Sequence, residues 1–97
     1  MLEITFVKKK LKDGSWCAKC NDVSLRLEKD GLSQIVNQIV VADVNAPESE
    51  GIQLAQQHNV DRAPFFIVTN TITNAIDVFD VYFKFKRFVE RSEQVAA

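Results

Sequence analysis

The two cysteines constrain this chain more than any other feature. Cys17 and Cys20 are the only cysteines among 97 residues, and two residues separate them. Cysteines three positions apart can lie on one face of the first turn of a helix, near enough to form a disulfide or to share a metal ion. A thiol at a helix N-terminus is also biased toward the thiolate, because the unpaired backbone N–H groups there favour negative charge. The pair predicts a reactive dithiol if a helix begins at Cys17.

The residues before the cysteines have the pattern of a strand. Leu2, Ile4 and Phe6 alternate with polar side chains, which predicts a strand with one buried face over residues 2–7. The polar segment 8–15 contains a turn signal at Asp13-Gly14, and we expect a loop there. This loop would deliver the cysteines to the end of the strand.

The residues after the cysteines fit a helix over 17–29, although a strand is an alternative. Val23 and Leu27 have helical spacing, whereas Leu25 and Leu27 alternate with charged residues as in a strand. Gly31 follows where a helix C-cap would need it, which favours the helix.

The middle of the chain alternates strand and helix. The β-branched run 39–44 predicts a buried strand, and Pro47 with acids behind it predicts a helix that runs to about Asn59. Residues 65–68 form a dense apolar strand, and Pro64 stands at its beginning, where a missing N–H is tolerated. Residues 75–79 would return as a hairpin strand after the polar turn 70–74.

The last segment has two interpretations. Asp80 could cap a helix over residues 80–93, or the preceding strand could continue through Val81, Phe83 and Phe85. We favour the helix because residues 87–94 have no strand character. The phenylalanines of this region are expected in the core; they are Phe79, Phe83, Phe85 and Phe88.

These elements predict one α/β domain over residues 1–97, in the order β-α-β-α-β-β-α. The first two strands, joined by a helix, should be parallel, and the last two antiparallel. The N-terminal stretch lacks the apolar run of a signal peptide, so we expect a protein of the reducing cytoplasm and no membrane segment.

Charge gives little indication of a nucleic-acid or membrane partner. The net charge is −1, from 12 basic and 13 acidic side chains, so we expect neither partner. A local basic cluster, Lys8, Lys9, Lys10 and Lys12, is interpreted as a solvated strand end, with a partner-binding patch as the alternative.

Two landmarks together resemble the thioredoxin superfamily. One is the run from Trp16 to Cys20, which opens a helix after a strand, and the other is Arg62-Ala63-Pro64 before an apolar strand. The arrangement is most similar to glutaredoxins and small thioredoxin-like proteins, since a single strand precedes the cysteines. The resemblance implies a thioredoxin-like fold, with a mixed four-stranded sheet flanked by helices.

The resemblance also implies roles for individual residues. Cys17 would be the nucleophile that attacks a substrate disulfide, and Cys20 would resolve the mixed disulfide. Pro64 would be the cis-proline of the site, and Ala63 would offer its backbone to an extended substrate. Trp16 would flank the site as its aromatic neighbour.

The chain departs from the family at several positions. The dipeptide between the cysteines, Ala18-Lys19, is typical of neither thioredoxins nor glutaredoxins, and Lys19 is expected to favour the thiolate by its charge. The glycine pair with which glutaredoxins bind glutathione is missing from residues 70–74. We therefore expect no tightly bound cofactor, and glutathione only as a reductant. The first strand carries no acid except Glu3, so the buried carboxylate that thioredoxins use as a proton acceptor is not identified.

The sequence therefore predicts a monomeric thiol–disulfide oxidoreductase acting on protein or small-molecule disulfides and recharged by a protein or thiol reductant. One alternative is a partner-binding adaptor that presents the Ala63-Pro64 groove and the lysines of residues 8–12. A weaker alternative is a metal or iron–sulfur carrier, for which His58 is the only other nitrogen or sulfur ligand. We expect no metal site, and we assign His58 to the surface or to a helix C-terminus.

Overall fold

The chain forms a four-stranded sheet and three α-helices in a computed structural model. The structure describes the backbone of residues 1–96 and the side chains of residues 1–92. The elements are β1 (Leu2–Lys10), α1 (Ala18–Lys29), the short 3-10 helix η1 (Ser33–Ile35), β2 (Gln38–Asp43), α2 (Glu50–Gln57), β3 (Phe65–Asn70), β4 (Ile76–Phe79) and α3 (Tyr82–Ala96). The predicted order of strands and helices is confirmed, and the last segment is a helix.

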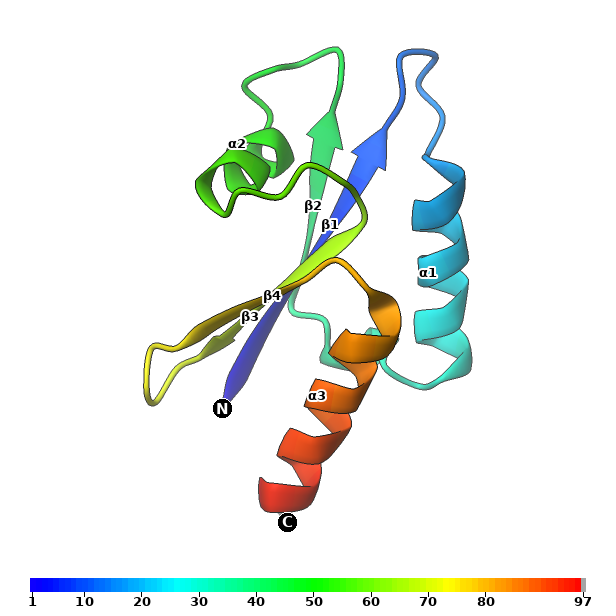
Figure 1. The fold of residues 1–97 in the computed structure, drawn as a ribbon. Helices are drawn as coiled ribbons and strands as arrows, with labels where there is room; N and C mark the ends of the chain where they lie inside the picture. The colour runs from blue at the N-terminus through cyan, green and yellow to red at the C-terminus, as the bar shows by residue number, and fades with distance from the viewer. Residues whose placement is uncertain (97) are drawn as a thin grey trace.

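The sheet is mixed, with the strand order β2-β1-β3-β4. β1 pairs with β2 in parallel and with β3 antiparallel, and β3 and β4 form an antiparallel hairpin. β1 is thus a central strand, and the loop that follows it lies at the end of the sheet away from the N-terminus (Figure 1). That loop and the beginning of α1 carry both cysteines.

Helices cover both faces of the sheet (Figure 1). α1 and α3 pack on one face through a core that contains Phe6, Phe66 and Phe85. α2 packs on the other face against a mostly aliphatic cluster that contains Val40, Ala42 and one ring, Phe65. The alternation of β1 explains this division, because Phe6 and Val7 point to opposite faces.

The face under α3 is built on stacked aromatic rings. The ring centroids of Phe6 and Phe66 are 4.7 Å apart, and those of Phe66 and Phe85 are 3.8 Å apart. Phe79 and Phe88 pack at the edge of this stack. The expectation that Phe83 belongs to the core was wrong: its side chain is 62% exposed, because it lies on the solvent side of α3.

β1 is longer than its hydrophobic pattern predicts. The expected loop at residues 8–10 is strand, because Lys8, Lys9 and Lys10 pair with β2 residues up to Asp43. Backbone hydrogen bonds to a neighbouring strand do not depend on apolar side chains, so the change to lysine hid the continuation. Lys8, Lys9 and Lys10 thus lie at the end of a strand and are half-buried, whereas Lys12 lies in the loop that follows.

α1 ends at a glycine, as expected. Gly31 has a φ of +71°, its N–H donates to the Glu28 carbonyl, and the Leu32 N–H donates to the Leu27 carbonyl. This pattern satisfies the last carbonyls of the helix. Asn59 ends α2 in the same way, with a φ of +56°.

α2 begins at Glu50, three residues later than the proline predicted. Residues 46–49 form a turn instead, and the Ser49 hydroxyl accepts a hydrogen bond from the Asp43 N–H at 3.0 Å. This contact attaches the helix start to β2. Gly51 then lies directly against β2: a Cβ there would be 2.6 Å from the Val41 carbonyl oxygen.

α3 begins at Tyr82, and Asp80 does not cap it. The first helical hydrogen bond runs from the Phe85 N–H to the Val81 carbonyl. The Asp80 carboxylate lies 3.9 Å from the Arg62 guanidinium instead. Within residues 1–96, none of the helices is both apolar enough and long enough to traverse a bilayer.

Candidate active site

Both cysteines lie at the start of α1, where the sequence places them. Cys17 is the N-cap residue, with extended backbone (φ −56°, ψ 136°), and the helix proper begins at Ala18. Cys20 lies in the first turn with its side chain buried, whereas Cys17 is half-exposed. Both are free thiols in this structure. Cys17 is therefore the more accessible of the two thiols.

One residue of β1 holds both cysteines in place. The Cys17 N–H donates to the Lys9 carbonyl at 3.1 Å, and the Lys9 N–H donates to Cys20 Sγ at 3.2 Å. The end of a central strand is a rigid part of a sheet, and it fixes the position of the thiol pair. Sequence reasoning missed this role because Lys9 was assigned to a loop.

The environment makes Cys17 the more acidic thiol. Burial is the largest single influence and by itself raises the pKa of Cys17. Hydrogen bonds from the Cys20 N–H, the Cys20 thiol and the Lys19 N–H, with the charge of Lys9, outweigh it and bring the pKa below the ordinary 9.0. Lys19 was expected to act through its charge. Lys19 instead lowers the pKa of Cys17 through its backbone N–H, after the two hydrogen bonds from Cys20, and the largest effect of a charge comes from Lys9.

Cys20 shifts in the opposite direction. Burial raises the pKa of Cys20 from 9.0 to about 11, and the hydrogen bond from the Lys9 N–H only partly compensates. The Cys17 sulfur adds to the rise. At neutral pH the buried thiol is therefore protonated, while the half-exposed one is biased toward thiolate.

Trp16 is covered by two lysines of β1. The Lys8 ammonium lies 4.3 Å from the centre of the Trp16 rings, and the Lys10 ammonium lies 5.9 Å from it. Trp16 also bridges back to Lys10 through the backbone. The expected aromatic neighbour thus directly precedes Cys17, and it holds two positive charges beside it.

The expected proline opens β3 next to α1. The Ala63–Pro64 peptide bond is cis, as the resemblance implies, and Pro64 is buried. Pro64 lines a surface groove of about 260 Å³ together with Lys19. The groove continues along residues that the sequence did not indicate as site residues; these are Asp22, Val23, Arg26, Arg62, Phe66, Asp80, Val81, Tyr82 and Phe83.

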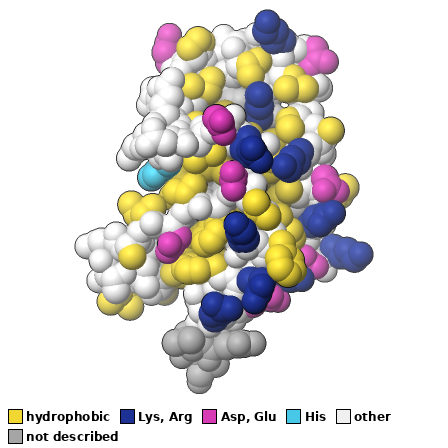
Figure 2. All heavy atoms as spheres, in the orientation of Figure 1, with side chains coloured by type: hydrophobic (Ala, Val, Ile, Leu, Met, Phe, Trp, Pro, Cys, Tyr) yellow, Lys and Arg dark blue, Asp and Glu magenta, His cyan; other side chains and the backbone are white. Residues whose placement is uncertain are grey.

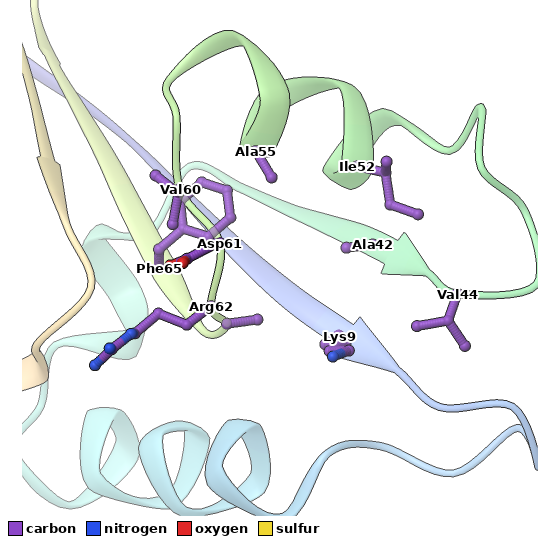
Figure 3. Close-up of a pocket in the computed structure, with 10 residues that line it drawn as sticks. Lys9, Ala42, Val44, Ile52, Ala55, Val60, Asp61, Arg62 and Phe65 are labelled. Atoms are coloured by element: carbon purple, nitrogen blue, oxygen red, sulfur yellow. The ribbon is translucent and has the colours of Figure 1, made fainter.

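Ala63 faces a different hollow from Pro64. A cavity of about 160 Å³ lies between α2 and the ends of β1 and β2, and Ala63 and Lys9 line it (Figure 3). Ile52 and Ala55 of α2 form its apolar wall, while the Arg62 side chain extends away from them (Figure 3). Ala63 and Pro64, the two residues before β3, therefore line two separate hollows.

Lys9 links this cavity to the cysteines. Among the side chains of residues 1–92, no charged or polar residue is fully buried. Lys9 is half-buried and lines the cavity, and its backbone contacts both cysteines. A basic side chain thus lies close to the thiols, and its charge favours the Cys17 thiolate.

No group of three or more His, Cys, Asp or Glu side chains gathers within the described part of the chain. His58 is the C-cap residue of α2, as expected from its position at a helix end. The carrier alternative would be tested by the metal content of freshly purified protein.

Comparison with known proteins leaves the site to be argued from its own geometry, because no protein-family model matches the chain and no curated protein matches its sequence.

Proposed function

We propose that this protein is a thiol–disulfide oxidoreductase with a thioredoxin-like fold, in which Cys17 is the nucleophile and Cys20 the resolving thiol. The observation that carries the proposal is the opposite pKa shift of two thiols in one helical turn, with the lowered pKa on the half-exposed sulfur. A structural pair of cysteines has no need of this difference, whereas disulfide exchange depends on it.

The arrangement of the fold supports the same proposal. A central strand ends at the N-terminus of a helix, two further antiparallel strands follow, and helices lie on both faces. This is the layout that the resemblance of the Trp16–Cys20 run implies. Pro64 lines a groove with Lys19 of α1, so an extended segment lying in the groove would pass close to the start of that helix.

The first chemical step follows from the protonation states. The Cys17 thiolate attacks one sulfur of the substrate disulfide, the substrate S–S bond breaks, and a Cys17–substrate disulfide forms. The other substrate sulfur leaves as a thiolate. Backbone N–H groups at the start of α1 stabilise the attacking charge before the reaction, because they already point toward the Cys17 sulfur.

The second step uses the buried thiol. Cys20 is protonated at neutral pH because its pKa is raised, and it must lose this proton before it can attack. The released substrate thiolate accepts the proton. Cys20 then attacks Cys17 Sγ, and the second substrate sulfur leaves and takes a proton from water. The substrate gains two electrons and two protons, and the protein is left with a Cys17–Cys20 disulfide. A dithiol protein or two molecules of a small thiol would return it to the reduced state.

A pair of cysteine variants tests the proposal. Reduction of a fluorescent peptide disulfide, with dithiothreitol as the final reductant, should be lost in Cys17→Ser. Cys20→Ser should instead accumulate a mixed disulfide with the peptide, which intact-mass spectrometry detects. Ser33→Ala, on the exposed η1, serves as the matched control and should retain full activity. Equal rates in wild type and Cys17→Ser would refute the proposal.

A further inference from the structure

Positive charge is concentrated around the thiols of an otherwise acidic chain. Residues 8–20 hold five of the 12 basic side chains and only one of the 13 acidic ones, Asp13. This segment therefore carries a net charge of +4, although the whole chain has a net charge of −1. The excess lies on the end of β1, the loop after it and the first turn of α1, which are the elements that form the site.

These positive charges are not neutralised within the described part of the protein. Arginines elsewhere pair with carboxylates: Arg26 lies 3.2 Å from Asp22, and Arg62 lies 3.9 Å from Asp80. Among side chains 1–92, none of the lysines in residues 8–20 has a carboxylate within 4.0 Å. The Asp13 carboxylate is occupied by Ser15, whose hydroxyl donates to it at 2.6 Å.

The charges lie on two elements next to Cys17, the end of β1 and the first turn of α1. Lys8 and Lys10 are held over Trp16, the residue before Cys17. Lys19 lies in the groove that contains Pro64, and the first turn of α1 contains no acidic residue. The two carboxylates further along this groove, Asp22 and Asp80, pair with arginines. In Figure 2, basic and exposed hydrophobic side chains lie over α1 and α3, with acidic side chains interspersed among them.

We propose that the partner of this site is a protein whose reactive disulfide lies in an acidic segment, with Asp or Glu beside the cysteine that Cys17 attacks. This inference rests on the proposed function and specifies its substrate. Acidic side chains would lie against Lys8, Lys10 and Lys19 while the disulfide reaches the Cys17 sulfur. Unpaired charges of one sign act mainly by steering the encounter, so the preference should appear in kcat/KM and weaken with salt.

Three peptide disulfides of equal length test the preference directly. Their cysteines are flanked by two Glu, two Gln or two Lys residues. At low ionic strength, the glutamate peptide should have a kcat/KM roughly 10-fold or more above that of the lysine peptide, with the glutamine peptide between them. The ratio should fall toward one at 0.5 M salt, where screening extends over only about 4 Å. Equal kcat/KM values for all three peptides would overturn the inference and leave the redox function intact.

Charge-matched variants identify the surface. In Lys8→Gln/Lys10→Gln, the ratio between the glutamate and lysine peptides should fall severalfold. Lys29→Gln/Lys84→Gln removes the same charge from exposed positions outside residues 8–20, and it should keep the wild-type ratio. An equal fall in both double variants would mean that net charge alone acts, and it would overturn the assignment to this surface.

A binding measurement separates this inference from the chemistry. Trp16 is the only tryptophan of the chain, so its fluorescence reports contact at Lys8 and Lys10 without any thiol exchange. Preferential binding of the glutamate peptide without turnover would support the acidic partner and refute the oxidoreductase. Tighter binding of a single-stranded oligonucleotide than of the glutamate peptide would overturn the inference in favour of a nucleic-acid surface.

Discussion

The two faces of the sheet are packed in different ways, and the site lies where they meet. The face under α1 and α3 has a continuous stack of phenylalanine rings. The face under α2 has mostly aliphatic side chains with a single buried ring, Phe65, and it also has the backbone contact of Gly51 and a cavity. The thiols belong to the first face, whereas the cavity side chain that affects their charge, Lys9, belongs to the second. The backbone of Lys9 thus holds the thiols at the end of β1, while its side chain lines the cavity on the α2 face.

The strongest test of this difference is the removal of a ring from the aromatic stack. Phe85→Ala should lower the free energy of unfolding by about 3–5 kcal/mol, because the side chain is fully buried and leaves a cavity between α3 and the sheet. Urea denaturation measures this loss. Phe83→Ala is the matched control on the same helix, and its cost should stay within about 0.5 kcal/mol since the side chain is 62% exposed. Similar costs for the two variants would contradict the assignment of faces.

On the other face, the close approach of α2 should be sensitive to added volume. Gly51→Val places its Cβ against the backbone of Val41 and Ala42, so α2 must shift, at a cost of about 1–3 kcal/mol. Gln53→Val places the same β-branched side chain on the exposed side of α2, where it meets no backbone of β2. If Gly51→Val unfolds in urea at the same midpoint as Gln53→Val, the predicted contact between α2 and β2 is absent.

The coupling between the faces can be tested through the acidity of Cys17. Lys9→Met keeps most of the aliphatic stem and removes the charge, so the pKa of Cys17 should rise. The thiolate fraction at pH 7 should then fall, and alkylation of Cys17 by iodoacetamide should become slower. The pH at which the alkylation rate reaches half of its maximum should move upward. Mass spectrometry assigns the alkylated cysteine, and Lys29→Met at the far end of α1 should follow the wild-type profile. An unchanged profile in Lys9→Met would remove Lys9 from the site.

The smallest effect concerns the attachment of α3 to α1. The Tyr82 hydroxyl donates to the Asp30 carboxylate at 2.7 Å, and this bond is the main cause that lowers the pKa of Asp30 below 3.8. A carboxyl with a lowered pKa in the folded state contributes stability above its unfolded pKa, and this contribution is lost as the pH falls through the folded value. Tyr82→Phe should therefore flatten the dependence of the urea midpoint on pH below about pH 4. Ser33→Ala should not change this dependence.

The sequence predicted most elements because their signals are local. The alternation of Leu2, Ile4 and Phe6, the position of Gly31 and the apolar run before the hairpin all depend on residues close in the chain. The continuation of β1 through Lys10 was missed, because a strand can be held by its neighbour alone. Phe83 was assigned to the core for a related reason, since composition gives no information on which side of α3 faces the sheet.

The site was predictable in its thiols and not in its surroundings. Cys17, Cys20 and Pro64 are marked by residue type and spacing. The groove at Tyr82 and Phe83, and the role of Lys9, arise from contacts between segments far apart in sequence. The sequence does not distinguish Lys9 from the neighbouring lysines, because its contacts with both cysteines depend on the fold.

The closed loop after β1 has a consequence for protein engineering. The Leu11 N–H donates to the Ser15 carbonyl at 2.8 Å, and Lys10 is bridged to Trp16. The two ends of the loop formed by residues 11–15 therefore lie next to each other. The two cysteines are hydrogen-bonded to Lys9, which precedes this loop. Foreign peptides inserted at Asp13-Gly14 should therefore be displayed beside the thiols without displacing them. Such insertions would make this chain a scaffold in which the inserted peptide selects the binding partner while the environment of Cys17 and Cys20 is unchanged.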